Sequence, residues 1–323
     1  MNQPVLEVRE LKKHFPIRKN VAVRAVDGVS FELREGEILG LVGESGSGKS
    51  TVAYTVVGMY RPTAGQVIFR GEDVSREAAR RNLGQKGQMQ IVFQDPGSSL
   101  NPRRTVRQIL RLPLMIHGLA KTESEKEEKA VDLLRRVELP EEYLDKYPSG
   151  MGGGERQLVA IARALATSPS LIIFDEPTSA LDVSVQAKVI NRLVELHRRL
   201  NLSYLFITHD LSLMRNVSSR VAIMYLGVIC EVAETKAFFT APRHPYTHML
   251  LSSIPVVSDL EEELKPRKVP SVGEIPSPVN IPRGCRFHPR CPEAVQQCRE
   301  AEPQLRPVAG GTHLVACHRA LPD

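Results

Sequence analysis

The segment from Gly43 to Thr51 reads Gly-Glu-Ser-Gly-Ser-Gly-Lys-Ser-Thr. It matches the spacing G-x-x-x-x-G-K-[ST], whose fixed positions are filled by Gly43, Gly48, Lys49 and Ser50. A loop of this kind surrounds a phosphate group with backbone N–H groups, while its lysine reaches the outer phosphates and its hydroxyl binds Mg²⁺. The chemistry predicted from these residues is the binding of a magnesium-bound phosphate.

The residues on both sides of this loop support the interpretation. An apolar run, Ile38 to Val42, precedes it and predicts a buried parallel strand. Residues 51–57 follow it and can continue as a helix. A glycine-rich turn with a chance lysine is the alternative, and the complete pattern with both flanks argues against it.

Polar residues stand at the ends of three further apolar runs. Gln94 follows residues 89–93, Asp175 and Glu176 follow residues 170–174, and His209 follows residues 203–208. Open α/β sheets place their ligands at the carboxyl ends of the strands, so these residues are expected at one edge. Asp175 would hold Mg²⁺, and Glu176 would orient or deprotonate a water in line with the γ-phosphate. Each residue taken alone also fits a solvated strand end.

The remaining pattern supplies the elements that must position these residues. Alternating residues 5–11 and 21–34 predict an antiparallel β region, and residues 66–70 predict a short strand. Helices are expected from Thr105 to a limit at Pro113, and over residues 123–137, 158–165 and 184–200. Residues 221–232 predict two strands that close the sheet.

Composition narrows the class of protein. The chain has 323 residues, a net charge of +6 and a pI near 9.1, which suits an anionic neighbourhood. No basic run is long enough to argue for nucleic acid, and no apolar run approaches the ~20 residues of a membrane helix. The first residues lack the layout of a signal peptide. We therefore expect a cytosolic, soluble protein whose membrane role, if any, needs a partner.

In this order, the motifs resemble those of ABC-transporter ATPases over the whole chain. Further segments resemble the subunits of dipeptide and oligopeptide importers: Ile91-Val92-Phe93-Gln94-Asp95-Pro96, His244-Pro245-Tyr246-Thr247, Gly273-Glu274-Ile275-Pro276 and Gly284-Cys285-Arg286-Phe287-His288-Pro289-Arg290-Cys291. The resemblance implies an α/β fold of the P-loop NTPase class, with a RecA-like core, an antiparallel β subdomain and a helical subdomain. The nucleotide-binding domain would span residues 1–240, with the helical part at about 96–166, and a Pro-rich, cysteine-containing extension would span 241–323.

The resemblance also implies site residues, cofactors and partners. The cofactors would be ATP and Mg²⁺, with Gln94, Glu176 and His209 catalytic and the metal held by Ser50, Gln94 and Asp175. ATP would be contacted by Phe15, Gly43, Ser45, Gly46, Gly48, Lys49, Ser50 and Thr51. Phe15 would stack on the purine, and a core or surface role for this ring is equally open.

The implied partners place the chain at the cytoplasmic face of the cell membrane as a peripheral subunit. They are a second, homologous ATPase chain, two transmembrane permease subunits docked on the helical insert and, indirectly, an extracytoplasmic binding protein; no nucleic acid is implied. A dipeptide, an oligopeptide, nickel or an oligosaccharide would be the cargo. A soluble ABC ATPase that acts on nucleic acid or ribosomes, and a regulatory ATPase that does not hydrolyse ATP, are the alternative functions.

One segment departs from the family pattern. The family signature Ser-Gly-Gly-Gln would fall on Gly152, Gly153, Gly154 and Glu155. A hydroxyl that would reach the partner's γ-phosphate is thus missing, and a carboxylate is added. We expect a weakened composite site here, an intact signature on the partner, and a dimer interface that includes Asp182.

Four of the five cysteines fall in the last forty residues, at positions Cys285, Cys291, Cys298 and Cys317. A cytosolic chain does not keep such thiols as disulfides. The C-x₂₋₄-C spacing typical of structural zinc sites does not occur among these cysteines. The family resemblance implies a [4Fe–4S] cluster, with zinc and metal-free thiols as alternatives. Cys230 is expected to be a small buried residue in a strand.

Overall fold

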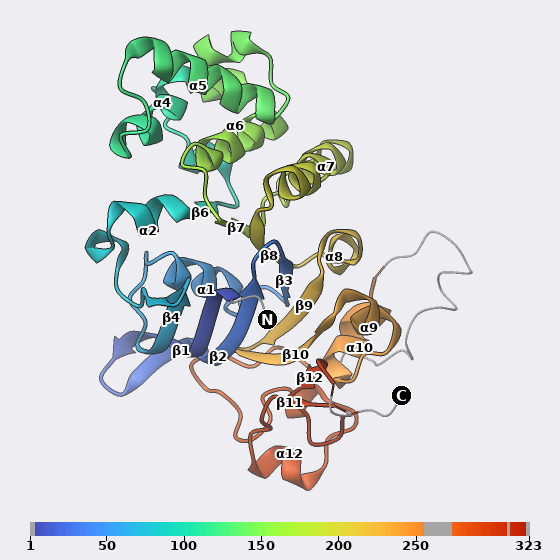
Figure 1. Ribbon diagram of the computed structural model, residues 1–323. Helices are drawn as coiled ribbons and strands as arrows, with labels where there is room; N and C mark the ends of the chain where they lie inside the picture. The colour runs from blue at the N-terminus through green and yellow to red at the C-terminus, as the bar shows by residue number, and fades with distance from the viewer. Residues whose placement is uncertain (1–3, 255–272, 309–310, 321–323) are drawn as a thin grey trace. The chain divides into compact units, whose positions relative to one another are not determined.

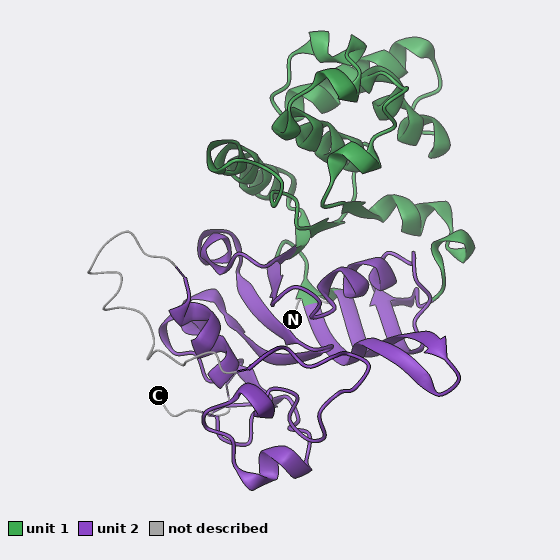
Figure 2. Cartoon of the chain, turned by 180° about the vertical axis from the view of Figure 1, so that it is seen from behind, with its two compact units in different colours: residues 1–5, 33–37, 76–206 green, residues 6–32, 38–75, 207–323 purple. Residues whose placement is uncertain are grey.

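Two compact units make up the chain in the computed structural model, which describes residues 4–254, 273–308 and 311–320 (Figure 1). Unit 1 contains residues 33–37 and 76–206, together with the N-terminal residues up to Val5 (Figure 2). Unit 2 contains residues 6–32, 38–75 and 207–323. Each unit interrupts the other in sequence, so both depend on contacts between distant parts of the chain.

An antiparallel sheet lies mostly in unit 2, with the first two residues of β1 and the last two of β2 assigned to unit 1. Its strands lie in the order β2-β1-β4-β5 and comprise β1 (Pro4–Arg18), β2 (Val21–Arg34), β4 (Ala64–Phe69) and β5 (Glu72–Asp73). β1 pairs with β4 in a register that places Leu6 opposite Phe69. The antiparallel β region predicted from alternation is confirmed, and β1 continues through Pro16, beyond the predicted end at residue 11.

A second set of strands in unit 2 carries the loop strand. Its order is β11-β12-β10-β9-β3, with β3 (Ile38–Val42), β9 (Arg220–Tyr225), β10 (Val228–Glu234), β11 (Arg306–Pro307) and β12 (Leu314–Val315). β3 and β9 are parallel, and every residue of β3 is buried. The two strands predicted over residues 221–232 are confirmed as β9 and β10. They do not close the sheet, because β12 and β11 continue it beyond β10.

The helices of unit 2 are short. They are α1 (Lys49–Val56), α8 (Leu211–Val217), α9 (Thr235–Thr240), α10 (Pro245–Ser252) and α12 (Gln296–Glu300), with a 3₁₀ turn, η4, at His288–Arg290. The helix predicted directly after the phosphate loop is confirmed. Within the predicted Pro-rich extension, 241–323, residues 255–272, 309–310 and 321–323 lie outside the described residues.

Unit 1 combines two parallel strands, β6 (Met89–Val92) and β7 (Leu171–Asp175), with a set of helices. The helices are α2 (Leu83–Gln88), α3 (Pro96–Ser99), α4 (Val106–Ile116), α5 (Glu123–Arg136), α6 (Gly153–Leu165) and α7 (Val183–Leu200). The 3₁₀ turns η1 (Ala78–Arg80), η2 (Glu141–Asp145) and η3 (Pro148–Gly150) connect them. The fully buried strand β8 (Ser203–Thr208) begins in unit 1, and its last two residues belong to unit 2.

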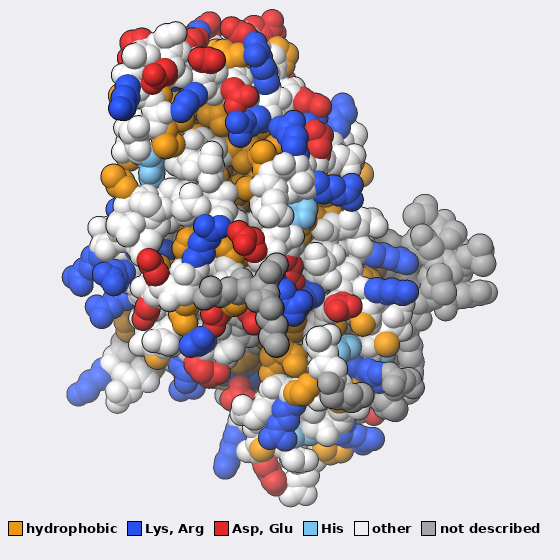
Figure 3. Space-filling model, in the orientation of Figure 1, with side chains coloured by type: hydrophobic (Ala, Val, Ile, Leu, Met, Phe, Trp, Pro, Cys, Tyr) orange, Lys and Arg blue, Asp and Glu red, His pale blue; other side chains and the backbone are white. Residues whose placement is uncertain are grey.

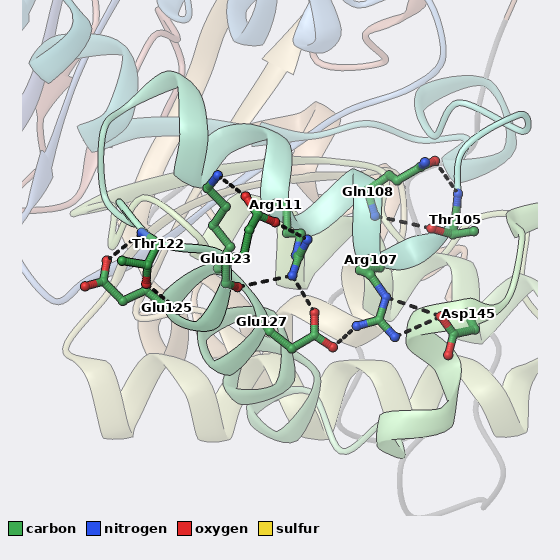
Figure 4. A network of polar contacts seen from close by, with 10 residues as sticks. Thr105, Arg107, Gln108, Arg111, Thr122, Glu123, Glu125, Glu127 and Asp145 are labelled. Atoms are coloured by element: carbon green, nitrogen blue, oxygen red, sulfur yellow. Dashed lines mark hydrogen bonds and ion pairs between the residues drawn. The ribbon is translucent and has the colours of Figure 1, made fainter.

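Ion pairs join the helices of the insert in unit 1 (Figure 4). Arg107 and Arg111, one turn apart on α4, both pair with Glu127 of α5, and Arg107 also pairs with Asp145 at 2.8 Å. The helix predicted over residues 123–137 is confirmed as α5, which buries an apolar stripe that consists of Ala130, Val131, Leu133 and Leu134. The prediction that Pro113 limits the preceding helix is wrong, because α4 continues to Ile116.

None of the helices within the described ranges is both long and apolar enough to cross a lipid bilayer.

Candidate nucleotide site

The phosphate loop of unit 2 joins the buried strand β3 to helix α1, which begins at Lys49. Gly48 has φ 106°, and a Cβ there would lie 2.0 Å from the Ala25 carbonyl oxygen. A Cβ on Gly43 would lie 2.1 Å from the Met224 carbonyl oxygen. Only glycine tolerates these positions, so the two motif glycines are required by the fold as well as by close approach of phosphate.

Lys49, the lysine of the loop motif, is only 5% exposed. It donates to the carbonyl oxygen of Gly43 at 2.7 Å and to that of Glu44 at 3.0 Å. These two hydrogen bonds hold the Lys49 charge against the backbone of the phosphate loop. A phosphate bound there would exchange weak carbonyl acceptors for charged ones, which strengthens the hydrogen bonds.

The carboxylates predicted after the buried strand lie in unit 1. Asp175, 1% exposed, ends β7, and Glu176 follows with φ 48°. The Gln94 side-chain amide donates to the Glu176 carboxylate at 3.2 Å and to the Ser179 hydroxyl at 3.3 Å. The structure thus brings Gln94 and Glu176 together, as their positions after parallel strands predicted. A left-handed backbone at a non-glycine residue is a strained conformation that concentrates at functional sites.

Two further predicted residues lie in unit 2. His209 is exposed and directly follows the last residue of β8. Phe15, on β1, packs edge-on against Tyr60 with ring centroids 5.3 Å apart, and the Lys13 ammonium lies 4.9 Å from its ring centre. Phe15 is only half-buried, so part of its ring stays available for stacking.

The glycine-rich segment opens helix α6 in unit 1, with Gly152 as its N-cap residue. The Gly152 backbone N–H donates to the Glu155 carboxylate at 2.8 Å. This is one of the two hydrogen bonds of a capping box; the other needs a cap side chain, which glycine lacks. Gly154 lies against α7, since a Cβ there would be 2.3 Å from a Val185 methyl carbon. Asp182 caps α7 by accepting the Val185 N–H at 3.0 Å.

Comparisons with known proteins agree with this arrangement. The model of the ABC transporter family matches residues 26–179, and the model of the oligopeptide/dipeptide transporter C-terminal region matches residues 230–298. The oligopeptide transport ATP-binding protein AppF of Bacillus subtilis is 47% identical over 98% of this chain and 97% of its own length. This chain belongs to the ATP-binding proteins of peptide ABC transporters. As an ABC ATPase, it is an enzyme of the ATP-hydrolysing kind.

Other relatives of the ABC ATPase extend the comparison. The putative peptide import ATP-binding protein BOV_A0347 of Brucella ovis is 45% identical over 98% of both chains. The cassette MJ0796, solved as a post-hydrolysis dimer bound to ADP and phosphate, has a TM-score of 0.64 at 27% identity, covering 71% of this chain and 98% of its own. CbiO1 from Clostridium perfringens, part of the complex cbiONQ, has a TM-score of 0.65 at 25% identity, covering 77% of this chain and 96% of its own. These matches confirm the predicted fold class.

The tail cysteines of the ABC ATPase lie together in unit 2. Cys285, Cys291, Cys298 and Cys317 all line one cavity of about 10 Å³. Burial raises the pKa of Cys291 to about 11 and that of Cys317 to about 12. Among the residues that the structure describes, no group of three or more His, Cys, Asp or Glu side chains is arranged to hold a metal ion. The predicted iron–sulfur or zinc site is therefore not supported by this placement. Cys230 is buried in β10, as predicted.

Three residues at the phosphate loop, one within it and two that contact it, were not predicted from the sequence. Glu44 occupies a variable position of the loop motif, and Tyr246 and Arg290 follow it by some two hundred residues or more. Tyr246 and Arg290 fall in segments that suggested the importer family, but no spacing rule connects them to Glu44.

Proposed function

We propose that this chain binds MgATP at its phosphate loop and hydrolyses it to drive peptide import through a membrane transporter. The observation that carries the proposal is the complete loop between β3 and α1, with Lys49 held over its carbonyl groups. Curated relatives named for oligopeptide or peptide transport, such as AppF, support the cargo.

We assign the chemical roles by the family resemblance. Lys49 contacts the β- and γ-phosphates, and the other ATP contacts are those predicted above. Ser50, Gln94 and Asp175 hold Mg²⁺, Glu176 activates the water, and His209 donates to the γ-phosphate. The hydrogen bond from Gln94 to Glu176 supports this assignment, because it orients the carboxylate that must act on the water. The domain division at residue 240, with a helical part at 96–166, belongs to the same proposal.

An exposed apolar face on α4 supports docking of the membrane subunits. Leu112, Met115 and Ile116 of α4 are 40%, 55% and 54% exposed and lie at helical spacing. Leu119, just beyond the end of the helix, is 38% exposed. Figure 3 shows hydrophobic side chains between charged ones over the helices of unit 1. A contiguous exposed apolar surface marks an interaction site. Two permease subunits would dock here and hold the chain at the cytoplasmic membrane face.

A partner chain would complete the ATP site at this phosphate loop. Because Gly152 supplies no hydroxyl, we propose a different, homologous ATPase chain whose intact signature faces this phosphate loop. An extracytoplasmic binding protein would deliver the peptide to the permeases.

The decisive experiment purifies the chain with its membrane subunits and measures MgATP hydrolysis with and without peptide-loaded binding protein. Glu176→Gln should lower turnover about a hundredfold or more while leaving nucleotide binding intact. Lys49→Ala should abolish tight MgATP binding. Wild-type turnover in Glu176→Gln, or stimulation by DNA, RNA or ribosomes instead of by permeases, would refute the proposal.

A [4Fe–4S] cluster in the tail is a separate proposal, which rests on the family resemblance. Each cluster ligand binds its own iron, so four thiols around a cavity need not converge on one point as zinc ligands must. The cavity is small, and binding would have to spread the thiols. An anaerobic preparation should contain iron and sulfide and lose both in Cys291→Ser. Stoichiometric zinc, or protein without metal, would refute the cluster.

A further inference from the structure

The side chain of Glu44, inside the phosphate loop, is held by an arginine from the C-terminal segment. The Arg290 guanidinium donates to both carboxylate oxygens, Nη1 to Oε2 at 2.8 Å and Nη2 to Oε1 at 3.2 Å. This two-point contact fixes direction as well as charge. The backbone of Glu44 is held too: its N–H donates to the Tyr246 hydroxyl at 3.2 Å, and its carbonyl accepts from Lys49 at 3.0 Å.

The groups that hold Glu44 are themselves rigidly packed. Arg290 is 4% exposed and Tyr246 is fully buried. The Tyr246 ring lies 4.7 Å from that of Tyr225 and 5.2 Å from that of Phe287, and the Arg290 guanidinium lies within 5.9 Å of the latter two rings. Side chains packed against two aromatic rings have few alternative rotamers, so they hold the loop in one conformation.

The charge at Glu44 gives this contact a consequence for nucleotide binding. A carboxylate in a phosphate loop repels the triphosphate, since the interaction of like charges is strong where water is partly excluded. Glu44 keeps only 26% of its side chain exposed, and its ion pair with Arg290 neutralises it. Without the arginine, the same carboxylate would be free to turn toward the phosphates.

We propose that Arg290 and Tyr246 are positioning residues of the nucleotide site. Through them, the C-terminal segment fixes the conformation of the phosphate loop. Arg290 neutralises Glu44 and fixes its direction, and Tyr246 fixes the Glu44 backbone. This inference rests on the proposed nucleotide binding at the same loop and adds to it the contribution of residues beyond position 240.

The test compares MgATP affinity, measured with a fluorescent nucleotide, in the wild-type chain, Arg290→Gln, Glu44→Gln and the double variant. Arg290→Gln should weaken binding about tenfold, because it leaves Glu44 uncompensated. Glu44→Gln should bind nearly as the wild type does, and the double variant should return to within about threefold of it. Rescue by Glu44→Gln is the signature of a charge effect, which general loosening of the tail would not show.

Tyr246→Phe supplies a second measurement that keeps the buried ring. It should weaken MgATP binding about threefold by removing one hydrogen bond to the loop. Tyr204→Phe in unit 1 is the matched control, because it also removes a buried hydroxyl that is hydrogen-bonded to the backbone. The Tyr204 hydroxyl donates to the Leu193 carbonyl oxygen at 3.2 Å, and the Tyr246 hydroxyl accepts from the Glu44 N–H. The control should bind MgATP unchanged.

The outcomes separate this inference from the proposed function. A wild-type chain that does not bind MgATP refutes the proposed function itself. Wild-type binding with unchanged affinity in Arg290→Gln, or a loss that Glu44→Gln does not rescue, overturns the inference alone. If Arg290→Gln does not fold, the comparison of Tyr246→Phe with Tyr204→Phe decides, and equal affinities overturn it.

Discussion

The Tyr143 hydroxyl donates a hydrogen bond to the carboxylate of Glu155, whose other oxygen accepts the Gly152 backbone N–H at 2.8 Å. Glu155, which stands where the family signature has Gln, therefore has its carboxylate hydrogen-bonded at the start of α6, where the helix dipole favours a negative group. In this chain Glu155 stabilises a helix N-terminus whose cap residue has no side chain.

Replacement of Glu155 should destabilise unit 1. Glu155→Ala should lower the free energy of unfolding by about 1 kcal/mol, since it removes an acceptor from the Gly152 N–H and a charge from the helix start. Urea unfolding followed by circular dichroism measures the change. Full wild-type stability in Glu155→Ala would contradict the capping role.

The same residue predicts a pH dependence. The hydrogen bond from Tyr143, followed by that from Gly152, holds the pKa of Glu155 below its ordinary value of 4.5. A carboxylate with a depressed pKa stabilises the fold above its unfolded pKa, and this contribution is lost as the pH falls through the folded value. Stability should therefore decline below about pH 4.5 less steeply in Glu155→Gln than in the wild type. Identical pH profiles would argue against the contribution.

Gly152→Ser should be accommodated without strain and should raise ATP turnover. Gly152 has φ −66° and ψ 162°, and its added Cβ would lie 3.6 Å from the Glu155 carboxylate, an ordinary contact. The new hydroxyl can cap α6, which is worth only a few tenths of a kcal/mol, so any larger effect must come from the nucleotide. Turnover is measured in the assembled transporter, and a gain in stability without a gain in turnover would contradict a weakened composite site.

Gly154 is expected to tolerate no side chain while Val185 is present. A Cβ there would lie 2.3 Å from a Val185 methyl carbon, so Gly154→Ala should cost about 1–3 kcal/mol through overpacking between α6 and α7. Val185→Ala in the same chain should recover most of this loss. Thermal unfolding of the single and double variants measures the coupling, and additive effects would show that the two sites do not compete for space.

Glu231→Gln should loosen the C-terminal segment from β10. The Glu231 carboxylate is fully buried and accepts from the Arg243 N–H at 2.8 Å, the His244 N–H at 3.0 Å and the His313 ring at 2.6 Å. An amide turns one acceptor into a donor that faces other donors, so about 2 kcal/mol should be lost. Hydrogen exchange in residues 243–248 and 311–316 should rise, while that of α5 in unit 1 should not; an equal rise in both would point to global destabilisation.

Several elements of the fold and the phosphate loop were predictable from short-range spacing of residues. The phosphate loop, its flanking strand and helix, and the buried run before Asp175 follow from short-range patterns, because a loop that binds phosphate and a strand that is buried on both faces each constrain consecutive residues. The apolar stripe of α5 was predictable for the same reason, since helical periodicity lies within one segment.

Two predictions about secondary structure were wrong because tertiary packing outweighed local preferences. Pro113 lies within α4 although proline usually disrupts a helix interior, and packing of the buried residues Ile109, Leu110 and Leu114 keeps the helix intact. The strands β11 and β12 are too short to show a pattern, and they exist only because β10 offers an edge to pair with.

The amino-acid sequence by itself determined the class of protein and the phosphate loop, because these depend on residue types at fixed short spacing. Only the tertiary structure decided that Glu155 caps a helix, that the tail extends a sheet, and that Arg290 and Tyr246 hold Glu44. Such contacts join residues far apart in the chain, and their existence depends on packing that no local pattern encodes.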